Sequence, residues 1–474
     1  MNAPAPRTGV DPRTHALLHA PILPLLLRLA WPNVLVMLAQ SATGLIETYF
    51  VGHLGTDALA GMALVFPGVM LMQMISAGAM GGGISSAIAR ALGSQRRSDA
   101  NDLVIHALVI NLGLGLAFSV LVLTSGRPLY RLLGGEGASL EAALSYSNVV
   151  FAGMPLLWVM NAQASVIRGT GNMLVPSLVT CLGVLVLIPL SPALIFGFGP
   201  LPGLGVAGGG TALVLFYASG AVFQGWYVLS GRNAARLTRA RLAWPMFRQI
   251  LSVGAVATVS SLQTNVTIMA TTAFVGAAAG PDALAGYGTG ARLEYLLIPL
   301  VFGLGAPLVA LVGTNIGAGQ RARALQVAGC GAVIAFVLTE AIGLLAAWRP
   351  EVWLSLFGTD PAMLSAGRAY LTAVGPAYGF FGLGLVLYFA SQGAGRLLWP
   401  LVGGFVRVAI AVGGGWLALA LAGLPGLFAA LAAGLVAYGL IVATAVWRGA
   451  WFDPPPLASP ALDTVLLANA IDEP

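Results

Sequence analysis

The sequence predicts an all-α membrane protein in which twelve transmembrane helices form two pseudo-symmetric six-helix bundles, related as parallel repeats. Three observations lead to this fold class. Apolar residues make up 58% of the 474 residues and charged residues only 8%, whereas soluble domains carry about 25% charged residues because their surfaces are solvated. Apolar stretches long enough to cross a bilayer recur along the whole chain. The two halves of the chain also repeat one another.

The apolar stretches define the expected helices. Each has roughly 20 residues or more, the length that crosses a hydrocarbon core of about 30 Å. The twelve stretches are 26–51, 60–90, 103–124, 146–167, 174–196, 206–230, 247–275, 284–316, 325–347, 364–390, 398–421 and 425–448. The segments at both ends are short, so no soluble domain is expected beside the membrane part.

Arginine counts orient the expected helices. The net charge is +6, and all 22 cations are arginines, because the sequence contains no lysine. Cytoplasmic loops carry an excess of basic residues. One side holds the N-terminal segment, Arg28, Arg90, Arg96, Arg97, Arg168, the cluster between 232 and 248, Arg321, Arg323, Arg396 and Arg448, and the other holds only Arg127, Arg131, Arg349 and Arg368. We therefore expect a multi-pass protein of the cytoplasmic (inner) membrane with both termini in the cytoplasm.

This orientation divides the chain into five parts. A cytoplasmic N-terminal tail (1–20) precedes an N-lobe with the first six helices (21–230). A cytoplasmic linker (231–248) leads to a C-lobe with the last six helices (249–450), and a cytoplasmic C-terminal tail follows (451–474).

Composition also excludes several kinds of chemistry. Without lysine there is no Schiff-base nucleophile and no P-loop lysine. The arginines sit between apolar spans, where membrane topology explains them, so no nucleic-acid partner is expected. Cys181 and Cys330 lie within apolar stretches and predict neither a disulfide nor a metal site. We therefore expect no enzyme and no bound metal or cofactor.

The internal repeat has an offset of about 224 residues. Three matches share this register: 57–61 (DALAG) with 282–286, 93–96 (GSQR) with 318–321 (AGQR), and 168–172 (RGTGN) with 392–396 (QGAGR). Each half holds an even number of helices, so both halves enter the membrane from the same side, as in transporters built from parallel repeats. A substrate cavity is expected between the two bundles.

Polar residues on the first helix form a stripe that ends at Glu47. Inserting a charged residue such as Asp at the centre of a transmembrane helix costs about 2.5–3.5 kcal/mol. An acid at such a place is therefore expected to have a structural or functional role. Asn33, Gln40 and Glu47 follow at steps of seven, and Thr43 lies on the same face. We expect this stripe to line a hydrated cavity, and the alternative is that Glu47 reaches the outer interface.

The seventh helix carries a second stripe, without an acid. Its members are Ser260, Gln263, Thr264, Thr267 and Thr271, of which the last three align by the repeat with Gln40, Thr43 and Glu47. We expect this stripe to form a second cavity wall, and the alternative is hydrogen bonding between packed helices.

Four further polar residues complete the candidate cavity. Arg292 and Glu294 are two residues apart and do not face each other on a helix, so each needs a partner elsewhere. They form either a structural ion pair with such a partner or part of a substrate or proton site. Asn161 and Gln163 are expected to line the cavity or to bind neighbouring helices. His106, a lone imidazole in the third span, is expected to be a packing residue.

Several motifs resemble those of the multidrug and toxic compound extrusion (MATE) family. They are 44–55 (GLIETYFVGHLG) with 57–60 (DALA), 168–171 (RGTG), 195–199 (IFGFG) with 205–208 (GVAG), and 317–319 (GAG). The resemblance extends over about residues 22–450. It implies twelve helices in two lobes and export of cationic, amphipathic organic compounds in exchange for protons or sodium.

Departures from the family pattern bear on the coupling ion. The family usually has an aspartate where Glu47 stands, and its fifth helix often has Asn and Asp four residues apart, where this chain has Leu187 and Ser191. The stretches 249–275 and 364–390 contain no acid, so a sodium site made of several carboxylates is not expected. One desolvated carboxyl group suffices for a proton, and we expect Glu47 to be the coupling group.

The sequence thus predicts a secondary active antiporter, a monomer, that exports cationic or amphipathic drugs and toxins in exchange for H⁺ by alternating access. Its expected partners are small organic cations and the lipid bilayer. No cofactor is expected, and an H⁺ gradient, or a Na⁺ gradient, supplies the energy for transport. Two alternatives stay open. One is coupling to Na⁺. The other is a lipid-linked oligosaccharide flippase of the same wider superfamily, whose members often add two helices and a cationic cavity, neither of which is evident in the sequence.

Overall fold

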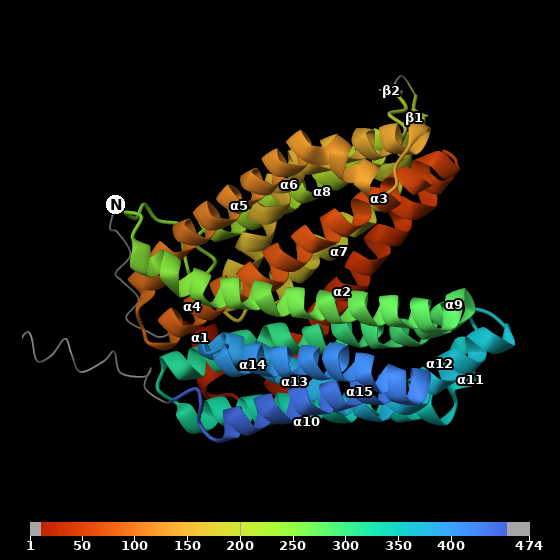
Figure 1. Ribbon diagram of the computed structural model, residues 1–474. Coiled ribbons are helices and arrows are strands. Elements are labelled where there is room, and N and C mark those ends of the chain that lie inside the picture. Colours follow the sequence, from red (N-terminus) through yellow and green to blue (C-terminus); the bar gives the residue numbers. More distant parts are fainter. Residues whose placement is uncertain (1–10, 200, 453–474) are drawn as a thin grey trace, which may run out of the picture.

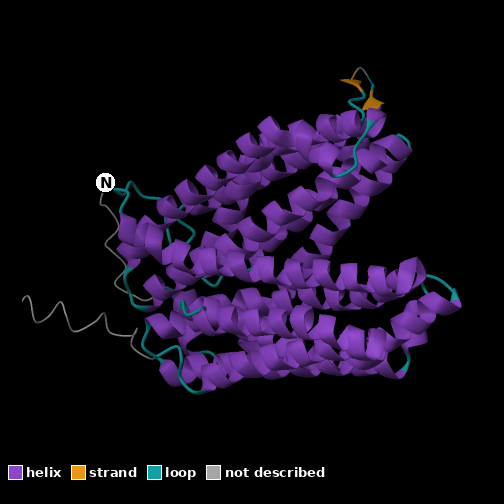
Figure 2. Cartoon of the chain, in the orientation of Figure 1, coloured by secondary structure: helices purple, strands orange, loops and turns teal. Residues whose placement is uncertain are grey.

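The computed structural model describes residues 11–199 and 201–452, and nearly all of them are helical (Figure 2). Ten helical stretches are long and apolar enough to cross a membrane. One of them has 74 residues, Trp244–Gly317, and a straight helix of that length would extend about 110 Å. Gly280, with a φ of 77°, interrupts it, and Gly423, with a φ of 67°, interrupts the stretch that ends at Trp447. Two of the ten stretches therefore cross twice, which gives the twelve predicted spans.

The first half of the chain forms six spans after a short helix, α1 (Pro12–His19). The spans are α2 (Ile22–Gly52), the continuous run of α3 (Thr56–Gln73), η1 (Met74–Met80) and α4 (Gly81–Gly93), then α5 (Arg97–Leu132), α6 (Gly137–Gly169), α7 (Leu174–Phe196) and α8 (Val206–Leu229). Between α7 and α8, β1 (Gly197–Phe198) pairs antiparallel with β2 (Leu201–Pro202).

The second half forms the other six spans. Its elements are α9 (Trp244–Gly317), α10 (Arg321–Trp348), α11 (Pro350–Leu354), α12 (Pro361–Val374), η2 (Gly375–Ala377), α13 (Tyr378–Ala394), α14 (Leu398–Val408), η3 (Ala409–Gly414) and α15 (Gly415–Trp447). Gly280 divides α9 into two spans. The run from α12 to α13 crosses once, and the run from α14 to α15 turns back at Gly423.

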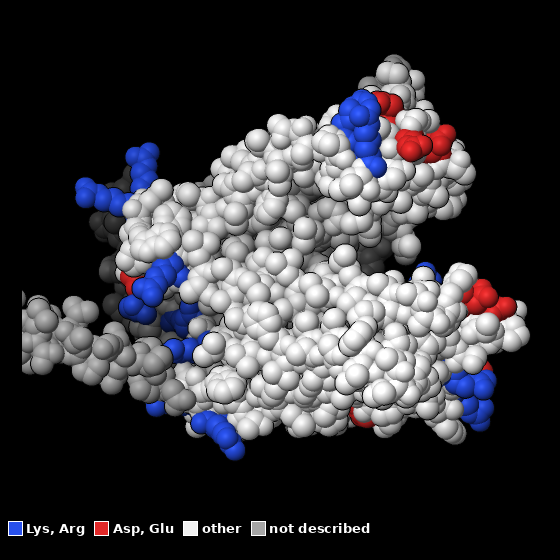
Figure 3. All heavy atoms as spheres, in the orientation of Figure 1, with Lys and Arg blue, Asp and Glu red and all other residues white. Residues whose placement is uncertain are grey.

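The spans form two lobes that meet at one end and diverge at the other (Figure 1). The end where they meet carries the loops 94–96, 170–173, 230–243, 318–320 and 395–397, and we call it the arginine-rich end. We call the other the open end, and it carries the β-hairpin and α11. Figure 3 shows arginines at both ends and a gap between the lobes at the second. The loops at the first end hold the larger number, namely Arg96, Arg232, Arg236, Arg239, Arg241 and Arg396. The predicted separation of arginine-rich and arginine-poor loops is therefore present.

At the arginine-rich end, the first turns of α2 and of α9 each pack against the opposite lobe. Leu26 of α2 packs in one apolar cluster with Val301 and Leu304 of the C-lobe, whereas Ile250, at the start of α9, belongs to the N-lobe core. The expected boundaries at 21 and 249 are thus not boundaries of packing, because the first turns of each lobe bury their apolar side chains in the other lobe.

Helix α4 seals this end against α9 and α13. A Cβ added at Gly93 would lie 2.1 Å from the Thr314 carbonyl oxygen, and one at Gly317 would lie 2.1 Å from the Arg90 carbonyl oxygen. Only glycine allows the helices to come so close. Ser86 Oγ also donates to the Gln392 carbonyl at 2.6 Å, and Arg90 donates to the Gly393 carbonyl at 3.1 Å.

The expected tails contain ordered structure. Residues 1–10 and 453–474 lie outside the described residues, but 12–19 form α1, whose Leu17 and Leu18 are buried. The Leu17 carbonyl accepts from Asn315 Nδ2 at 3.2 Å, and Trp451 Nε1 donates to Ser391 Oγ at 3.1 Å. The described parts of the two segments, 11–20 and 451–452, therefore pack on the C-lobe.

The linker is shorter than expected, because α9 begins at Trp244. His106 of α5 holds its end: Nδ1 lies 2.6 Å from the Asp102 carbonyl oxygen, and Nε2 accepts from the Ala243 amide at 2.9 Å. Both ring nitrogens have partners, so His106 has the structural role that the sequence predicts.

Candidate substrate cavity and coupling site

A cavity of about 290 Å³ lies between the lobes. Both lobes contribute side chains to its walls. The N-lobe supplies Met37, Gln40, Gln73, Met74, Asn161 and Arg168, and the C-lobe supplies Ser260, Ser261, Gln263, Thr264, Thr267, Ile298, Phe302, Phe381, Leu385, Tyr388, Phe389, Arg407, Val408 and Tyr438, among others. A cavity bounded by both lobes changes shape when the lobes move relative to each other, which is what alternating access requires.

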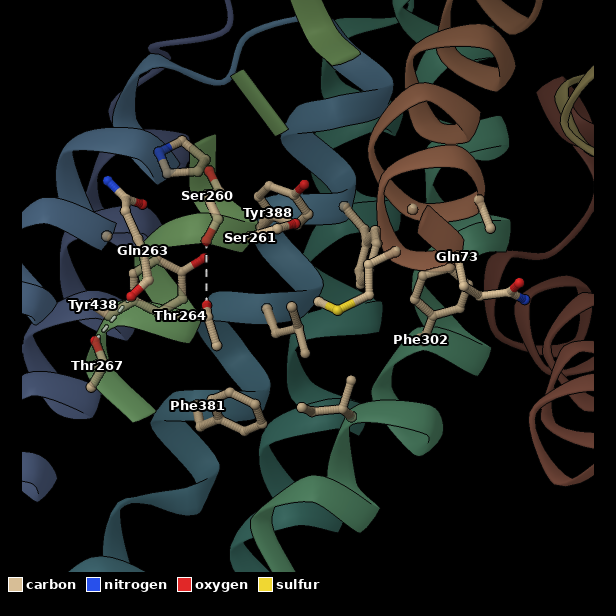
Figure 4. A pocket seen from close by; sticks show the side chains of 18 of the residues that line it. Gln73, Ser260, Ser261, Gln263, Thr264, Thr267, Phe302, Phe381, Tyr388 and Tyr438 are labelled. Carbon is tan, nitrogen blue, oxygen red and sulfur yellow. Dashed lines mark hydrogen bonds between the residues drawn. The ribbon is translucent and has the colours of Figure 1, made fainter. Parts of the chain in front are cut away.

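The first half of α9 presents a polar row to the cavity (Figure 4). Thr264 Oγ1 donates to the Ser260 carbonyl at 3.3 Å, and Thr267 Oγ1 donates to the Gln263 carbonyl at 3.1 Å. Gln263 Nε2 donates to the Leu401 carbonyl at 3.3 Å. A hydroxyl that donates its hydrogen keeps its acceptor lone pairs, so this wall can accept hydrogen bonds from a ligand.

Aromatic rings form much of the C-lobe wall. Phe302 and Phe389 meet edge to face with ring centroids 5.1 Å apart, and Tyr388 and Phe389 lie 5.2 Å apart. In Figure 4, Phe381 and Tyr438 lie beside the polar row, and Gln73 lies across from it. Apolar, aromatic walls with a few placed polar groups are typical of sites for small organic molecules.

Six predicted cavity residues line this cavity. They are Gln40, Asn161, Ser260, Gln263, Thr264 and Thr267. Gln40 and Thr264 correspond by the internal repeat and come from the two lobes, so the expected pair of walls is present at this level of the stripes.

Three predicted N-lobe residues do not line the cavity. Asn33 is buried and donates to the Leu29 carbonyl at 3.4 Å, and Thr43 donates to the Ala39 carbonyl at 3.1 Å. Gln163 packs against α8, where a Cβ at Gly225 would lie 3.0 Å from its Nε2. All three side chains face their own helix or a neighbouring helix, which was the alternative for Gln163.

Glu47 lies inside the N-lobe. Its side chain is only 5% exposed, and Oε1 accepts from the Tyr146 hydroxyl at 2.9 Å. Gly209 of α8 leaves room for it, since a Cβ there would lie 3.6 Å from Oε1. Glu47 thus neither lines the central cavity nor reaches the outer interface. The hydrogen bond from Tyr146 of α6 and the space that Gly209 leaves on α8 hold Glu47 toward these two helices.

Three predicted C-lobe residues also lie off the cavity. Thr271 and Glu294 line a smaller hollow beside it, together with Tyr287, Tyr295 and Tyr370. Arg292 is exposed, and its guanidinium lies 5.5 Å from the centroid of the Phe357 ring. Arg292 and Glu294 therefore have separate partners, as their spacing predicts.

The chain also matches known proteins. Two segments, residues 32–193 and 257–417, match the MatE family model, one in each lobe, and together they cover more than half of the chain. The chain belongs to the MATE family. As a MATE protein it is a multi-pass membrane transporter and not an enzyme, and the two matched segments repeat the offset seen in the sequence.

Two curated relatives illustrate the range of this MATE protein's homologues. A FAD transporter from Shewanella oneidensis is 30% identical over 382 residues, which are 80% of this chain and 83% of that protein. A probable multidrug resistance protein NorM from Thermotoga maritima is 26% identical over 393 residues, which are 81% of this chain and 82% of that protein.

Solved structures share the fold. A crystal structure of MATE in the bent conformation has a TM-score of 0.86 at 22% identity and covers 93% of this chain and 98% of its own. A MOP superfamily transporter from Pyrococcus furiosus has a TM-score of 0.84 at 21% identity and covers 94% of this chain and 100% of its own.

Two cavity residues of this MATE protein were missed by sequence reasoning. Arg168 precedes the last residue of α6 and was counted as a loop arginine, and Arg407 was not assigned to the cavity, yet both line it. The lining residues in the described part of the chain include no Asp or Glu. The cavity thus contains two cations that were not evident in the sequence, because only the fold brings these two arginines to one space.

Arg407 is partly neutralised by Glu294. Its Nη2 lies 3.4 Å from Glu294 Oε1, and the two side chains are 13% and 15% exposed. Tyr370 donates its hydroxyl to Glu294 Oε2 at 2.9 Å, and Arg407 also lies 5.7 Å from the centroid of the Phe381 ring. Glu294 thus takes part in a structural ion pair at the cavity edge, which is one of the two roles that the sequence left open.

Proposed function

We propose that this transporter exports amphipathic organic compounds, drugs among them, from the cytoplasm in exchange for protons by alternating access. The observation that carries this proposal is the aromatic cavity shared by both lobes, sealed at the arginine-rich end. The multidrug resistance proteins among its relatives support it. By the positive-inside rule the arginine-rich end faces the cytoplasm, which makes this arrangement outward-facing in the inner membrane.

Glu47 is the proposed proton carrier. Among the described residues none forms an ion pair with Glu47, and the Tyr146 hydroxyl donates a hydrogen bond to it. Ionising a buried carboxyl group costs free energy unless a partner compensates it, so Glu47 can hold a proton until water or a rearranged N-lobe reaches it. Sodium prefers several oxygen ligands, and within residues 11–199 and 201–452 no second acid contacts Glu47.

Coupling then acts through α2 and not by competition for one carboxylate. Glu47 does not line the cavity, so a substrate there does not touch it, and the simplest form of mutual exclusion is excluded in this arrangement. Helix α2 carries Gln40 at the cavity and Glu47 in the N-lobe, seven residues or about 10 Å apart. We propose that the proton and the substrate favour different positions of α2, so that each weakens binding of the other.

The lining favours amphipathic substrates over strictly cationic ones, because it includes two arginines and no acid in the described residues. Export of a flavin nucleotide is a second candidate function, favoured by these arginines and by the relative named FAD transporter. Of the two features typical of the flippase alternative, cavity arginines are present, but the two further helices are not, since the described residues form twelve spans.

The test is transport in proteoliposomes under separately imposed gradients. Ethidium, an aromatic cation, and flavin mononucleotide (FMN), an aromatic anion, serve as substrates. We expect an H⁺ gradient to drive movement of at least one of them and a Na⁺ gradient of equal size to drive neither. Transport driven only by Na⁺ would show that the coupling ion is wrong, and no transport of any amphipathic compound would refute the proposed export.

A further inference from the structure

Arg168 is a buried cation without a partner. The residue is 8% exposed, and its Nε is buried without a hydrogen bond. In the described part of the chain no side chain or carbonyl pairs with its guanidinium, in contrast to Arg407, which has Glu294. Buried charges in proteins are normally paired or hydrogen-bonded. An unpaired guanidinium on a cavity wall therefore points to a ligand that completes it.

Arg168 lies where the central cavity meets a smaller hollow. Both spaces are lined by Ala77, Gly78, Arg168, Phe302 and Phe389. The hollow, of about 20 Å³, adds the side chains of Ser85, Ser165 and Gln392, and Gln392 Oε1 is also buried without a partner. A space of this size admits about one water, so the charged group of a ligand reaches Arg168 from the central cavity and not from within the hollow.

The charges around Arg168 determine whether a positive or a negative ligand group can bind beside it. The described lining of the central cavity and of the hollow includes no acid. A cation placed beside Arg168 would be repelled at short range in a poorly solvated site. A phosphate or carboxylate would pair with the guanidinium, which can offer two parallel N–H groups to two oxygens.

A structural role for Arg168 does not account for its burial. It lies in the last turn of α6, where a positive charge is favoured by the helix dipole. That interaction needs no burial, and it is small compared with the cost of removing a guanidinium from water. A helix-end arginine with no other role would extend into solvent, as its long side chain allows.

We propose that Arg168 binds the phosphate or carboxylate of an aromatic anion at the floor of the central cavity. The rings of Phe302, Tyr388 and Phe389 then pack against the aromatic part of the same ligand, since they line the cavity next to Arg168. The proposal rests on the proposed function, because it takes the central cavity as the substrate site, and it names the substrate class of that site.

The test compares two ligands that differ by one phosphate. Riboflavin and FMN share the ring system and the ribityl chain, and their binding to the purified full-length protein is followed by flavin fluorescence. We expect FMN to bind at least about tenfold more tightly than riboflavin, the effect of one hydrogen-bonded charge pair. Arg168→Gln should reduce this ratio to within about twofold of one, because FMN loses its charge partner and binds more weakly.

Two further variants control for charge and for folding. Arg131→Gln removes an exposed arginine at the open end, outside the cavity, and should keep the wild-type ratio. Arg168→Lys keeps a charge for the helix end but not the guanidinium geometry, and its ratio should lie between those of the wild type and Arg168→Gln. A ratio near one in the wild-type protein, or a ratio that Arg168→Gln leaves intact, would overturn the proposal.

A lipid competitor separates a soluble anion from a lipid headgroup. Short-chain phosphatidylglycerol carries a phosphate but no aromatic ring, and we expect it to displace FMN at least about tenfold less effectively than FMN itself. Displacement at equal concentration would assign the site to lipid phosphate and overturn the aromatic part of the proposal. The assay uses no gradient, so selective FMN binding without any transport refutes only the proposed export, whereas ethidium export without selective FMN binding refutes only this site.

Discussion

Glu47 and Tyr146 form a small polar site within the N-lobe, 2.9 Å apart and enclosed by α2, α6 and α8. Glu47→Gln keeps the shape and an acceptor for Tyr146 but removes the titratable group. We expect this variant to fold and to bind substrate, and its H⁺-driven export to fall to the level of empty vesicles. Glu47→Asp should retain part of the activity, because it keeps a carboxyl group. Export is measured in proteoliposomes under an imposed pH gradient.

Glu340→Gln is the matched control for this prediction. Glu340 is another acid within a span, but it accepts from the Gly379 amide at 2.7 Å in the C-lobe and lies far from the proposed coupling path. The glutamine oxygen can keep that hydrogen bond, so H⁺-driven export should continue. Wild-type export by Glu47→Gln would show that another group carries the proton, and Glu294 would be the next acid to test.

The Glu294–Arg407 pair gives a stability prediction. Both side chains are more than four-fifths buried, and removal of one partner of a buried pair typically costs about 3–5 kcal/mol because the other charge stays unpaired. Glu294→Gln should therefore lower the unfolding temperature in detergent more than Glu294→Gln combined with Arg407→Met. Additive losses in the double variant would mean that the two charges are not coupled.

At the scale of elements, the close crossing of α4 with α9 holds the arginine-rich end shut. Gly317→Ala would place a Cβ 2.1 Å from the Arg90 carbonyl oxygen, whereas Gly329 of α10 has nothing within 4 Å. We expect Gly317→Ala to shift the population toward open arrangements of this end and Gly329→Ala to leave it unchanged. Distances between spin labels at Ser98 and Ala322, measured by double electron–electron resonance, report this shift. Equal distributions in both variants would contradict the sealing role.

The number of spans and the turns between them followed from the sequence, because desolvation of the backbone leaves helices as the only way for such apolar stretches to cross a membrane. The start at Leu174 and the turns near Gly280 and Gly423 are examples. Some helices extend beyond the apolar stretch, as α5 (Arg97–Leu132) and α6 (Gly137–Gly169) do. The docking of α1 was missed, since eight residues with a short apolar pair carry little signal without the surface that buries them.

The sequence indicated which residues line the cavity only where they lie on one face of a single helix. The row from Ser260 to Thr267 lines the cavity as the helical period indicates. The place of Glu47 depends on Tyr146 and Gly209, which are distant in sequence. The place of Arg168 depends on how helices of both lobes converge, and a pattern along one helix contains no information about that.

At the scale of the molecule, the two lobes enclose one cavity that opens away from the arginine-rich end. In a background without Cys181 and Cys330, cysteines at Gln40 and Thr264 should react with a membrane-impermeant maleimide added outside intact cells, and a substrate should slow the reaction. Gln224→Cys, at a site that is 1% exposed inside the N-lobe, is the control and should stay unlabelled. Labelling of both cavity sites only from the cytoplasmic face would invert the proposed orientation.

The whole account requires that substrate and proton exclude one another through α2, although they bind at separate places. The most direct measurement is proton release from the purified transporter in weakly buffered detergent solution, followed with a pH indicator when substrate is added. We predict release of up to one proton per wild-type transporter and none from Glu47→Gln, with substrate binding retained in both. Substrate binding without proton release by the wild type, or equal release by Glu47→Gln, would contradict the account.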